Sequence, residues 1–133
     1  MSSNDSYLAV FLASKNSPRR AAWDAMSESQ RGAKTQEGIT AWKAWMEKHH
    51  AAIVTMGGPL GKTKQVSASG IVDASNEMGA FIVVRAASHQ AASAMFEKHP
   101  HFAIFPGDRI EVMPVMPIPV SYTHLTLPTI LRV

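Results

Sequence analysis

The sequence predicts a single α+β domain whose strands and helices follow one another in the order βαββαβ. The chain has 133 residues, of which 46% are hydrophobic and 17% charged, and this suits one domain with one core. Short apolar runs typical of strands recur along the chain. Between them lie helix-start signals followed by apolar residues at helical spacing.

The first half of the chain predicts one strand and two helices. Residues 7–13 are almost continuously apolar, as in a strand covered on both faces. Ser17 and Pro18 supply an N-cap hydroxyl and a first helical residue, so a short helix follows. Ser27 and Gln30 have the spacing of a capping box and begin a longer helix. Its apolar stripe, expected to pack on a sheet, consists of Ile39, Trp42, Trp45, Met46 and His49.

The second half predicts three further strands and one helix. Residues 52–56 form an apolar run that stops at the glycine-rich segment 57–61, where a turn or bulge is expected. Residues 62–69 would extend that strand or pair with it. The strongest strand signal is 80–84, and Ser88 then caps a helix.

The end of the predicted domain completes the sheet. Pro100 is expected to end the helix that Ser88 starts, because proline disfavours helical geometry in the residue before it. Residues 109–115 alternate as a last strand. The order predicts a ferredoxin-like fold, with an antiparallel four-stranded sheet and helices on one face. The other face would be bare, so we expect a homodimer.

Composition excludes several functional classes. The net charge of +3 comes from scattered residues, which predicts no nucleic-acid partner. The chain has no cysteine, so it has no thiolate nucleophile or Cys-containing metal site. No apolar run reaches the length of about 18 residues needed to span a membrane, and the polar start resembles no signal peptide. These features predict a cytoplasmic protein without a membrane partner.

His99 and His101 are the first candidates for catalytic residues. If the segment is extended, their side chains point to opposite sides, and one imidazole faces a cleft as an acid, a base or a ligand. The alternative is a structural corner in which His caps carbonyls and Pro breaks the helix. A lone His-x-His does not define a metal site, so neither a metal nor a cofactor is predicted.

Four other residues are candidates for the same cleft. Lys62 and Lys64 follow glycines and could bind an anionic ligand, although a β-bulge with solvated lysines explains the same pattern. The glycine-rich segment is one residue short of a Walker sequence and leads into a strand, not a helix. Asp73 is either a cleft acid or a turn residue. Trp42 is either a core residue or part of a pocket for a flat ligand.

Five strings of the chain share a pattern with a known family, namely Gly61–Val66, Gly70–Asp73, Phe81–Ala92, Phe96–His101 and Ile110–Met113. Together they resemble the YCII-related domain family over residues 7–117. The resemblance implies a dimeric ferredoxin-like α+β barrel with a cleft between sheet and helices, in a family whose activity is mostly unknown. Some relatives resemble small enzymes with a proposed His–Asp pair, but here the long helix has no His before His49. The corner reads His99-Pro100 where those relatives have Asp-Pro.

The last residues, 120–133, form a different kind of segment. Val120–Thr129 reads like a translated adapter from sequencing-library preparation, which indicates read-through in an assembled environmental sequence. We therefore expect this tail not to belong to the domain.

Three hypotheses about function follow. In the first, the chain is a small YCII-like enzyme that uses His-assisted proton transfer on a small organic substrate. In the second, it is a non-catalytic ligand-binding or regulatory accessory dimer. In the third, it is only a structural dimer module. The enzyme requires a histidine and a carboxylate that converge in the cleft. The binding protein requires a pocket without that pair.

Overall fold

The computed structural model describes residues 5–118, which form the predicted ferredoxin-like fold with one added hairpin. A one-turn 3₁₀ helix, His50–Ala52, precedes the second strand. The remaining elements are β1 Asp5–Leu12, α1 Pro18–Ala25, α2 Glu28–Lys48, β2 Ile53–Pro59, β3 Thr63–Ser67, β4 Gly70–Ala74, β5 Met78–Ala86, α3 His89–Ala94, α4 Pro100–Ala103 and β6 Arg109–Pro114.

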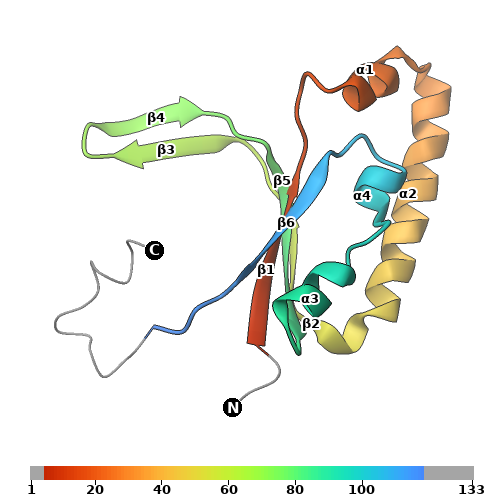
Figure 1. Cartoon of the computed structure of the whole chain (residues 1–133). Coiled ribbons are helices and arrows are strands. Elements are labelled where there is room, and N and C mark those ends of the chain that lie inside the picture. Colours follow the sequence, from red (N-terminus) through yellow and green to blue (C-terminus); the bar gives the residue numbers. More distant parts are fainter. Residues whose placement is uncertain (1–4, 119–133) are drawn as a thin grey trace.

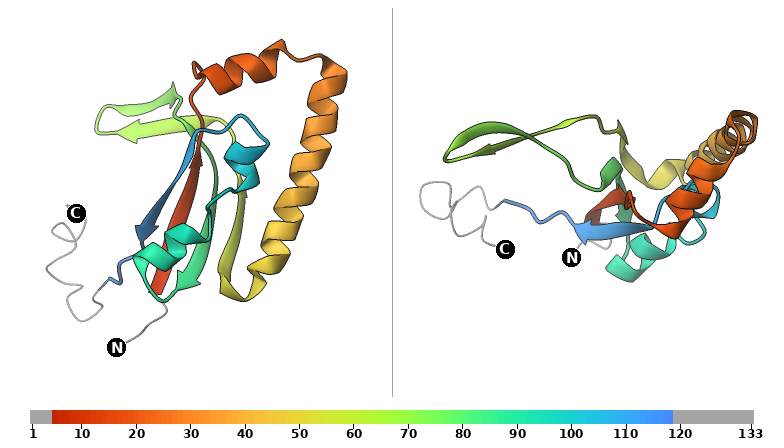
Figure 2. Two further views of the ribbon diagram at one scale, coloured as in Figure 1. Left: turned by 45° about the vertical axis from the view of Figure 1, so that its right-hand side comes forward. Right: turned by 90° about the horizontal axis from the view of Figure 1, so that it is seen from above.

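The main sheet has four antiparallel strands in the order β2-β5-β1-β6. Figure 1 shows this sheet edge-on, with all four helices on the same side of it. Two views from other directions show the same layers, with the long α2 running along the sheet (Figure 2). This arrangement confirms the predicted fold class.

The helix-start signals act as the sequence predicts. The Ser17 hydroxyl accepts a hydrogen bond from the Arg20 amide at 3.1 Å. Ser27 and Gln30 form both bonds of the capping box. The Ser88 hydroxyl caps α3 in the same way. Each cap satisfies an amide that the first turn of a helix leaves without a partner.

The core lies between the helices and one face of the sheet. On β1, Tyr7, Ala9 and Phe11 face the helices, together with Ile82 and Val84 of β5. Since side chains alternate along a strand, the intervening residues of β1 and β5 lie on the opposite face, which carries no helix. The main core cluster therefore lies on the helix side, while Val10 and Leu12 of β1 are buried on the opposite face.

The hairpin β3–β4 is the main difference from the sequence-based prediction. Residues 62–69 were expected to extend or pair with the second strand, but β3 pairs with β4 instead. Val66 lies opposite Ile71, and Lys64 lies opposite Asp73. The hairpin forms a separate two-stranded sheet that projects on the helix-free side (Figures 1 and 2).

The glycine-rich segment contains a bulge, one of the two expected forms. β2 continues through Gly58 to Pro59, and its pairing with β5 shifts between Thr55 and Gly58. Gly57 has φ +63°, and a Cβ there would lie 1.9 Å from the Phe81 carbonyl oxygen. Glycine is required at this position because both the left-handed backbone and the close approach exclude a side chain.

Two predictions concern the ends of the chain and the membrane. The segment 120–133 lies outside the described residues, so its exclusion from the domain stays a prediction. Within residues 5–118, no helix has both the length and the apolar character needed to cross a bilayer.

Candidate functional site

A cavity of about 490 Å³ lies between α2 and the sheet. Residues from β1, α2, β2 and β5 form its walls, and the loop after α4 closes one side. Its lining consists of Phe11, Ile39, Trp42, Lys43, Met46, Met56, Gly57, Gly58, Pro59, Gly79, Ala80, Phe81, Ile82, His101 and Phe105. A small-molecule site has this size and mainly apolar lining.

Close packing between α2 and the loop after α4 sets one wall of the cavity. Gly38 is buried within α2, and a Cβ there would lie 2.3 Å from the Phe105 ring. The Phe105 ring also contacts Trp42, with ring centroids 6.1 Å apart. Sequence reasoning missed Phe105, although a glycine inside a helix is a signal of close approach.

Trp42 belongs both to the core and to the cavity wall. Its ring packs against the core, where its centroid lies 5.1 Å from that of Phe11. It also lines the cavity. An aromatic side chain at a cavity wall offers a flat apolar surface on which a planar ligand can stack.

His101 is the histidine that lines the cavity. It is buried, and its Nε2 donates a hydrogen bond to the Leu12 carbonyl at 2.8 Å. Burial lowers the pKa of His101, although the backbone carbonyls of Leu12 and Arg109 and the Asp108 carboxylate oppose this shift. The imidazole is therefore held neutral, and its Nε2 proton is donated to the Leu12 carbonyl.

His99 is fully buried behind the cavity wall. Its Nδ1 accepts a hydrogen bond from the His101 amide at 3.0 Å and so caps α4. Because Nδ1 accepts, the proton of the neutral ring lies on Nε2. That atom is buried and has no hydrogen-bond partner among residues 5–118.

Aromatic rings surround His99. The Trp42 ring lies perpendicular to it at 4.5 Å between centroids, and the Trp45 ring lies at 4.9 Å. Burial lowers the pKa of His99 to about 3, with smaller contributions from His101 and His49. The neutral imidazole packs against these rings and caps α4.

The two histidines differ from the arrangement expected of an extended segment. Pro100 does not end a helix but occupies the first turn of α4, with His99 as the N-cap. The side chains of His99 and His101 are both buried, so neither faces solvent. The extended segment on which that expectation depended does not form, because the backbone after His99 is helical.

The lysines and the aspartate lie away from the histidines. Lys62, Lys64 and Asp73 line a separate surface hollow at the base of the β3–β4 hairpin. Lys64 Nζ lies 2.6 Å from the Asp73 carboxylate in an exposed ion pair. The predicted cleft shared by these residues and the histidines does not form, because hairpin pairing holds Asp73 beside Lys64.

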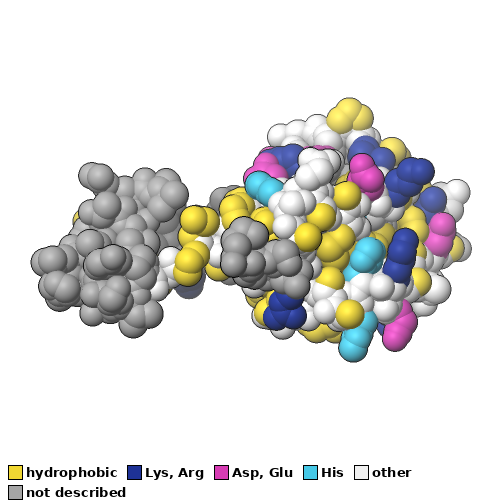
Figure 3. All heavy atoms as spheres, turned by 60° about the horizontal axis from the view of Figure 1, so that its bottom comes forward, with side chains coloured by type: hydrophobic (Ala, Val, Ile, Leu, Met, Phe, Trp, Pro, Cys, Tyr) yellow, Lys and Arg dark blue, Asp and Glu magenta, His cyan; other side chains and the backbone are white. Residues whose placement is uncertain are grey.

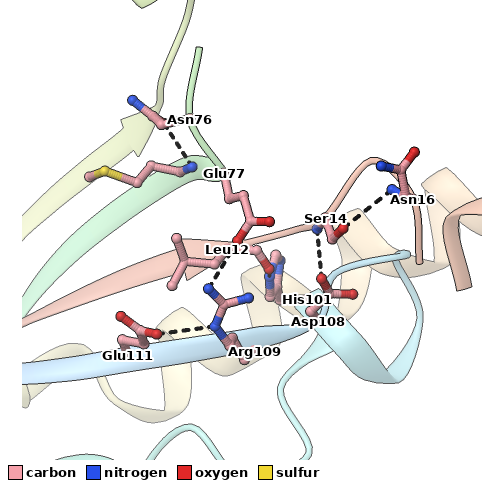
Figure 4. Close-up of polar contacts among 10 residues, drawn as sticks. Leu12, Ser14, Asn16, Asn76, Glu77, His101, Asp108, Arg109 and Glu111 are labelled. Carbon is pink, nitrogen blue, oxygen red and sulfur yellow. Dashed lines mark hydrogen bonds and ion pairs between the residues drawn. The ribbon is translucent and has the colours of Figure 1, made fainter.

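No carboxylate lines the cavity within the described part of the chain. The Asp108 carboxylate, which is near His101, accepts a hydrogen bond from the Ser14 amide at 2.6 Å. Figure 4 shows this contact beside the ion pairs that Arg109 makes with Glu77 and Glu111. Among residues 5–118, no three His, Asp or Glu side chains are grouped so as to hold a metal ion.

The charges on the surface visible in Figure 3 are mixed. Lys and Arg side chains alternate there with acidic and apolar ones and do not gather into a single cationic face. A groove that follows a phosphate backbone would require such clustering.

Comparisons with known proteins give a limited result. No protein-family model and no curated protein matches the chain. The chain is similar to the structure of a 5-chloro-2-hydroxyhydroquinone dehydrochlorinase from Burkholderia phenoliruptrix AC1100 in complex with 2,5-dihydroxybenzoquinone. The two are 18% identical, with 84% of this chain and 93% of that chain covered and a TM-score of 0.47. At that TM-score, the similarity supports no inference about function.

Proposed function

We propose that the chain binds a small, flat and mainly apolar molecule in the cavity between α2 and the sheet, without catalysing its conversion. The observation that carries the proposal is the lining of this cavity. Its walls are aromatic, aliphatic or glycine backbone, with Lys43 and His101 as the ionisable residues among those described. Burial of a planar ligand against such walls is favourable by the hydrophobic effect.

The state of the histidines favours binding over the enzymatic alternative. A His-assisted reaction requires an imidazole that is free to exchange a proton, in most cases with a carboxylate nearby. The Nε2 proton of His101 is held by the Leu12 carbonyl, and His99 is enclosed by rings. A role as a binding or regulatory module agrees with this arrangement.

A titration with a neutral fluorescent probe, N-phenyl-1-naphthylamine, tests the proposal. Ala80 lines the cavity and packs against the core, so Ala80→Phe should fill the space. We expect saturable binding to the wild type and a loss of about tenfold or more in affinity in this variant. Ala33→Phe, on an exposed part of α2, is the matched control and should bind as the wild type does.

Two results would contradict the proposal. One is absence of saturable binding to the folded wild type. The other is equal affinity in Ala80→Phe, provided that circular dichroism shows the variant to be folded. Turnover of a small organic substrate that is lost in a folded His101→Asn variant would instead support the enzymatic alternative.

A further inference from the structure

A second hollow, of about 590 Å³, adjoins the cavity between α2 and β2. Three residues line both spaces: Lys43, Met46 and Met56. The residues that line only the second space, which we call the outer hollow, are Glu47, His50, Ile53 and Val54. Because the two spaces share part of their walls, one molecule can occupy both of them.

The cavity and the outer hollow follow one another along α2 and β2. On α2, residues 39–46 contribute to the cavity and residues 43–47 to the outer hollow. On β2, residues 56–59 contribute to the cavity and residues 53–56 to the outer hollow. On both elements the outer hollow therefore lies nearer the 3₁₀ helix His50–Ala52, which joins α2 to β2 (Figure 2). Together the two spaces form one groove that runs toward this connection.

This groove is longer than a flat two-ring molecule. The α2 residues 39–47 line it over about 12 Å, at about 1.5 Å per residue. β2 has seven residues and covers about 20 Å at about 3.3 Å per residue. A ring system in the cavity therefore leaves the outer hollow free for a second part of the same ligand.

The walls of the outer hollow determine which chemical groups it suits. Its strand side is apolar: Val54 is 43% exposed, Met56 is 58% exposed and Ile53 is partly buried. An aliphatic chain would cover this side favourably. Its helix side carries the opposite charges of Lys43 and Glu47, which form no salt bridge within residues 5–118. These charges offset one another for an ionic end group, whereas an amide can donate to the carboxylate and accept from the ammonium group.

We propose that the ligand of the cavity has two parts, a flat apolar ring system and an aliphatic tail that ends in an uncharged polar group such as an amide. The ring system lies in the cavity beside Trp42. The tail passes Met46 and Met56 and lies along β2 in the outer hollow. This inference rests on the ligand-binding function proposed above and adds the chemical class of the ligand.

The edge of β2 does not suit an added peptide strand. β2 lies at the end of the sheet order β2-β5-β1-β6, so one of its sides carries no strand within the described residues. Its pairing with β5 shifts twice, and it ends at Pro59, which has no amide proton. These features break the regular row of donors and acceptors that strand addition requires. A small molecule with a flexible tail needs no such row.

Displacement of N-phenyl-1-naphthylamine by two neutral competitors measures the contribution of the tail. 2-Naphthylacetamide has a short tail, and 6-(2-naphthyl)hexanamide has the same ring system and end group with a longer aliphatic chain. We expect the wild type to bind the long competitor at least about tenfold more tightly than the short one. 6-(2-Naphthyl)hexanoate, which ends in a carboxylate, should bind with an affinity within about threefold of that of the hexanamide.

Val54 offers a variant that acts on the tail alone, because it lines the outer hollow and not the cavity. In Val54→Asp, the preference for the long competitor should fall by about fivefold or more, while the affinity for the short one changes by less than about twofold. Val66→Asp is the matched control, since Val66 is 74% exposed on β3 and lines neither space. Val54→Thr keeps the β-branched shape and should show a smaller loss in the same direction. Circular dichroism checks that each variant is folded.

Three results would overturn this inference and leave the ligand-binding proposal standing. They are equal affinities of the wild type for the short and long competitors, an unchanged preference in the folded Val54 variants, and a carboxylate that binds about tenfold or more tightly than the hexanamide. Absence of saturable binding of N-phenyl-1-naphthylamine to the folded wild type would instead contradict both proposals.

Discussion

The backbone amide of His101 donates a hydrogen bond to Nδ1 of His99 at 3.0 Å inside the core. The bond fixes the tautomer of His99 and starts α4, which in turn places His101 at the cavity wall. Two buried histidines therefore help to shape this side of the cavity. The consequence is a dependence of stability on pH.

We predict that the domain loses stability as the pH falls from about 6.5 toward 3. The folded state holds the pKa of His99 at about 3, below its ordinary value of 6.5, because burial disfavours the charged ring. The unfolded chain then binds more protons than the folded chain in this window, and stability falls with pH. The lowered pKa of His101 acts in the same direction.

Urea unfolding at pH 7 and pH 4.5 measures this effect in the wild type and in His99→Asn. Asn can still cap α4 but does not titrate. The variant loses ring packing, which costs about 1–3 kcal/mol at pH 7, and it should show a smaller difference between the two pH values. An equal difference in both proteins would contradict the assignment.

Gly57 and Gly58 both line the cavity and form a matched pair for substitution. Gly57→Ala should destabilise the domain by about 2 kcal/mol or more, because its backbone is left-handed and a Cβ would overlap the Phe81 carbonyl. A Cβ at Gly58 has no atom within 4 Å, so Gly58→Ala should change the free energy of unfolding by less than about 1 kcal/mol. Similar urea midpoints for the two variants would show that the backbone at Gly57 does not exclude a side chain.

Gly38 and Gly32 form a second pair, on α2. Gly38→Ala should displace the Phe105 ring, whose nearest atom lies 2.3 Å from the added Cβ, and should reduce probe affinity by changing the cavity wall. No atom lies within 4 Å of a Cβ at Gly32, so Gly32→Ala should stabilise the helix by about 0.5–1 kcal/mol. Thermal unfolding and probe titration of both variants check this prediction, which fails if Gly38→Ala binds the probe as tightly as Gly32→Ala does.

Lys43 should give the cavity a modest preference for anionic ligands. It lines the cavity, and no salt bridge engages it within residues 5–118. Because the side chain is exposed, Lys43→Met should lower affinity for 8-anilinonaphthalene-1-sulfonate by only about two- to fivefold at low salt. Affinity for neutral N-phenyl-1-naphthylamine should not fall. An equal loss for both probes would assign Lys43 to packing alone.

Local signals explain why much of the fold could be predicted from the sequence. The caps at Ser17, Ser27 and Ser88 depend on atoms within three residues of one another, so the sequence contains the whole interaction. The strands in the core also carry long apolar runs. These elements and their order are confirmed.

The β3–β4 hairpin and the conformation of the segment His99–His101 could not be predicted, because both depend on information that a single sequence lacks. β4 is exposed along most of its length, so it has no burial pattern that separates it from a turn. Pro100 is compatible with both the end and the start of a helix, and the His99 cap decides between them only after folding. The cavity joins Gly57, Phe81 and Phe105 across three segments, and no spacing in the chain predicts that they meet.

A crystal structure of the protein with N-phenyl-1-naphthylamine tests the central claim most directly. The account predicts that the naphthyl ring lies between α2 and β5, in contact with Trp42 and Phe105. A probe bound at the β3–β4 hairpin or elsewhere outside this cavity, or an empty cavity in a crystal soaked to saturation, would contradict it.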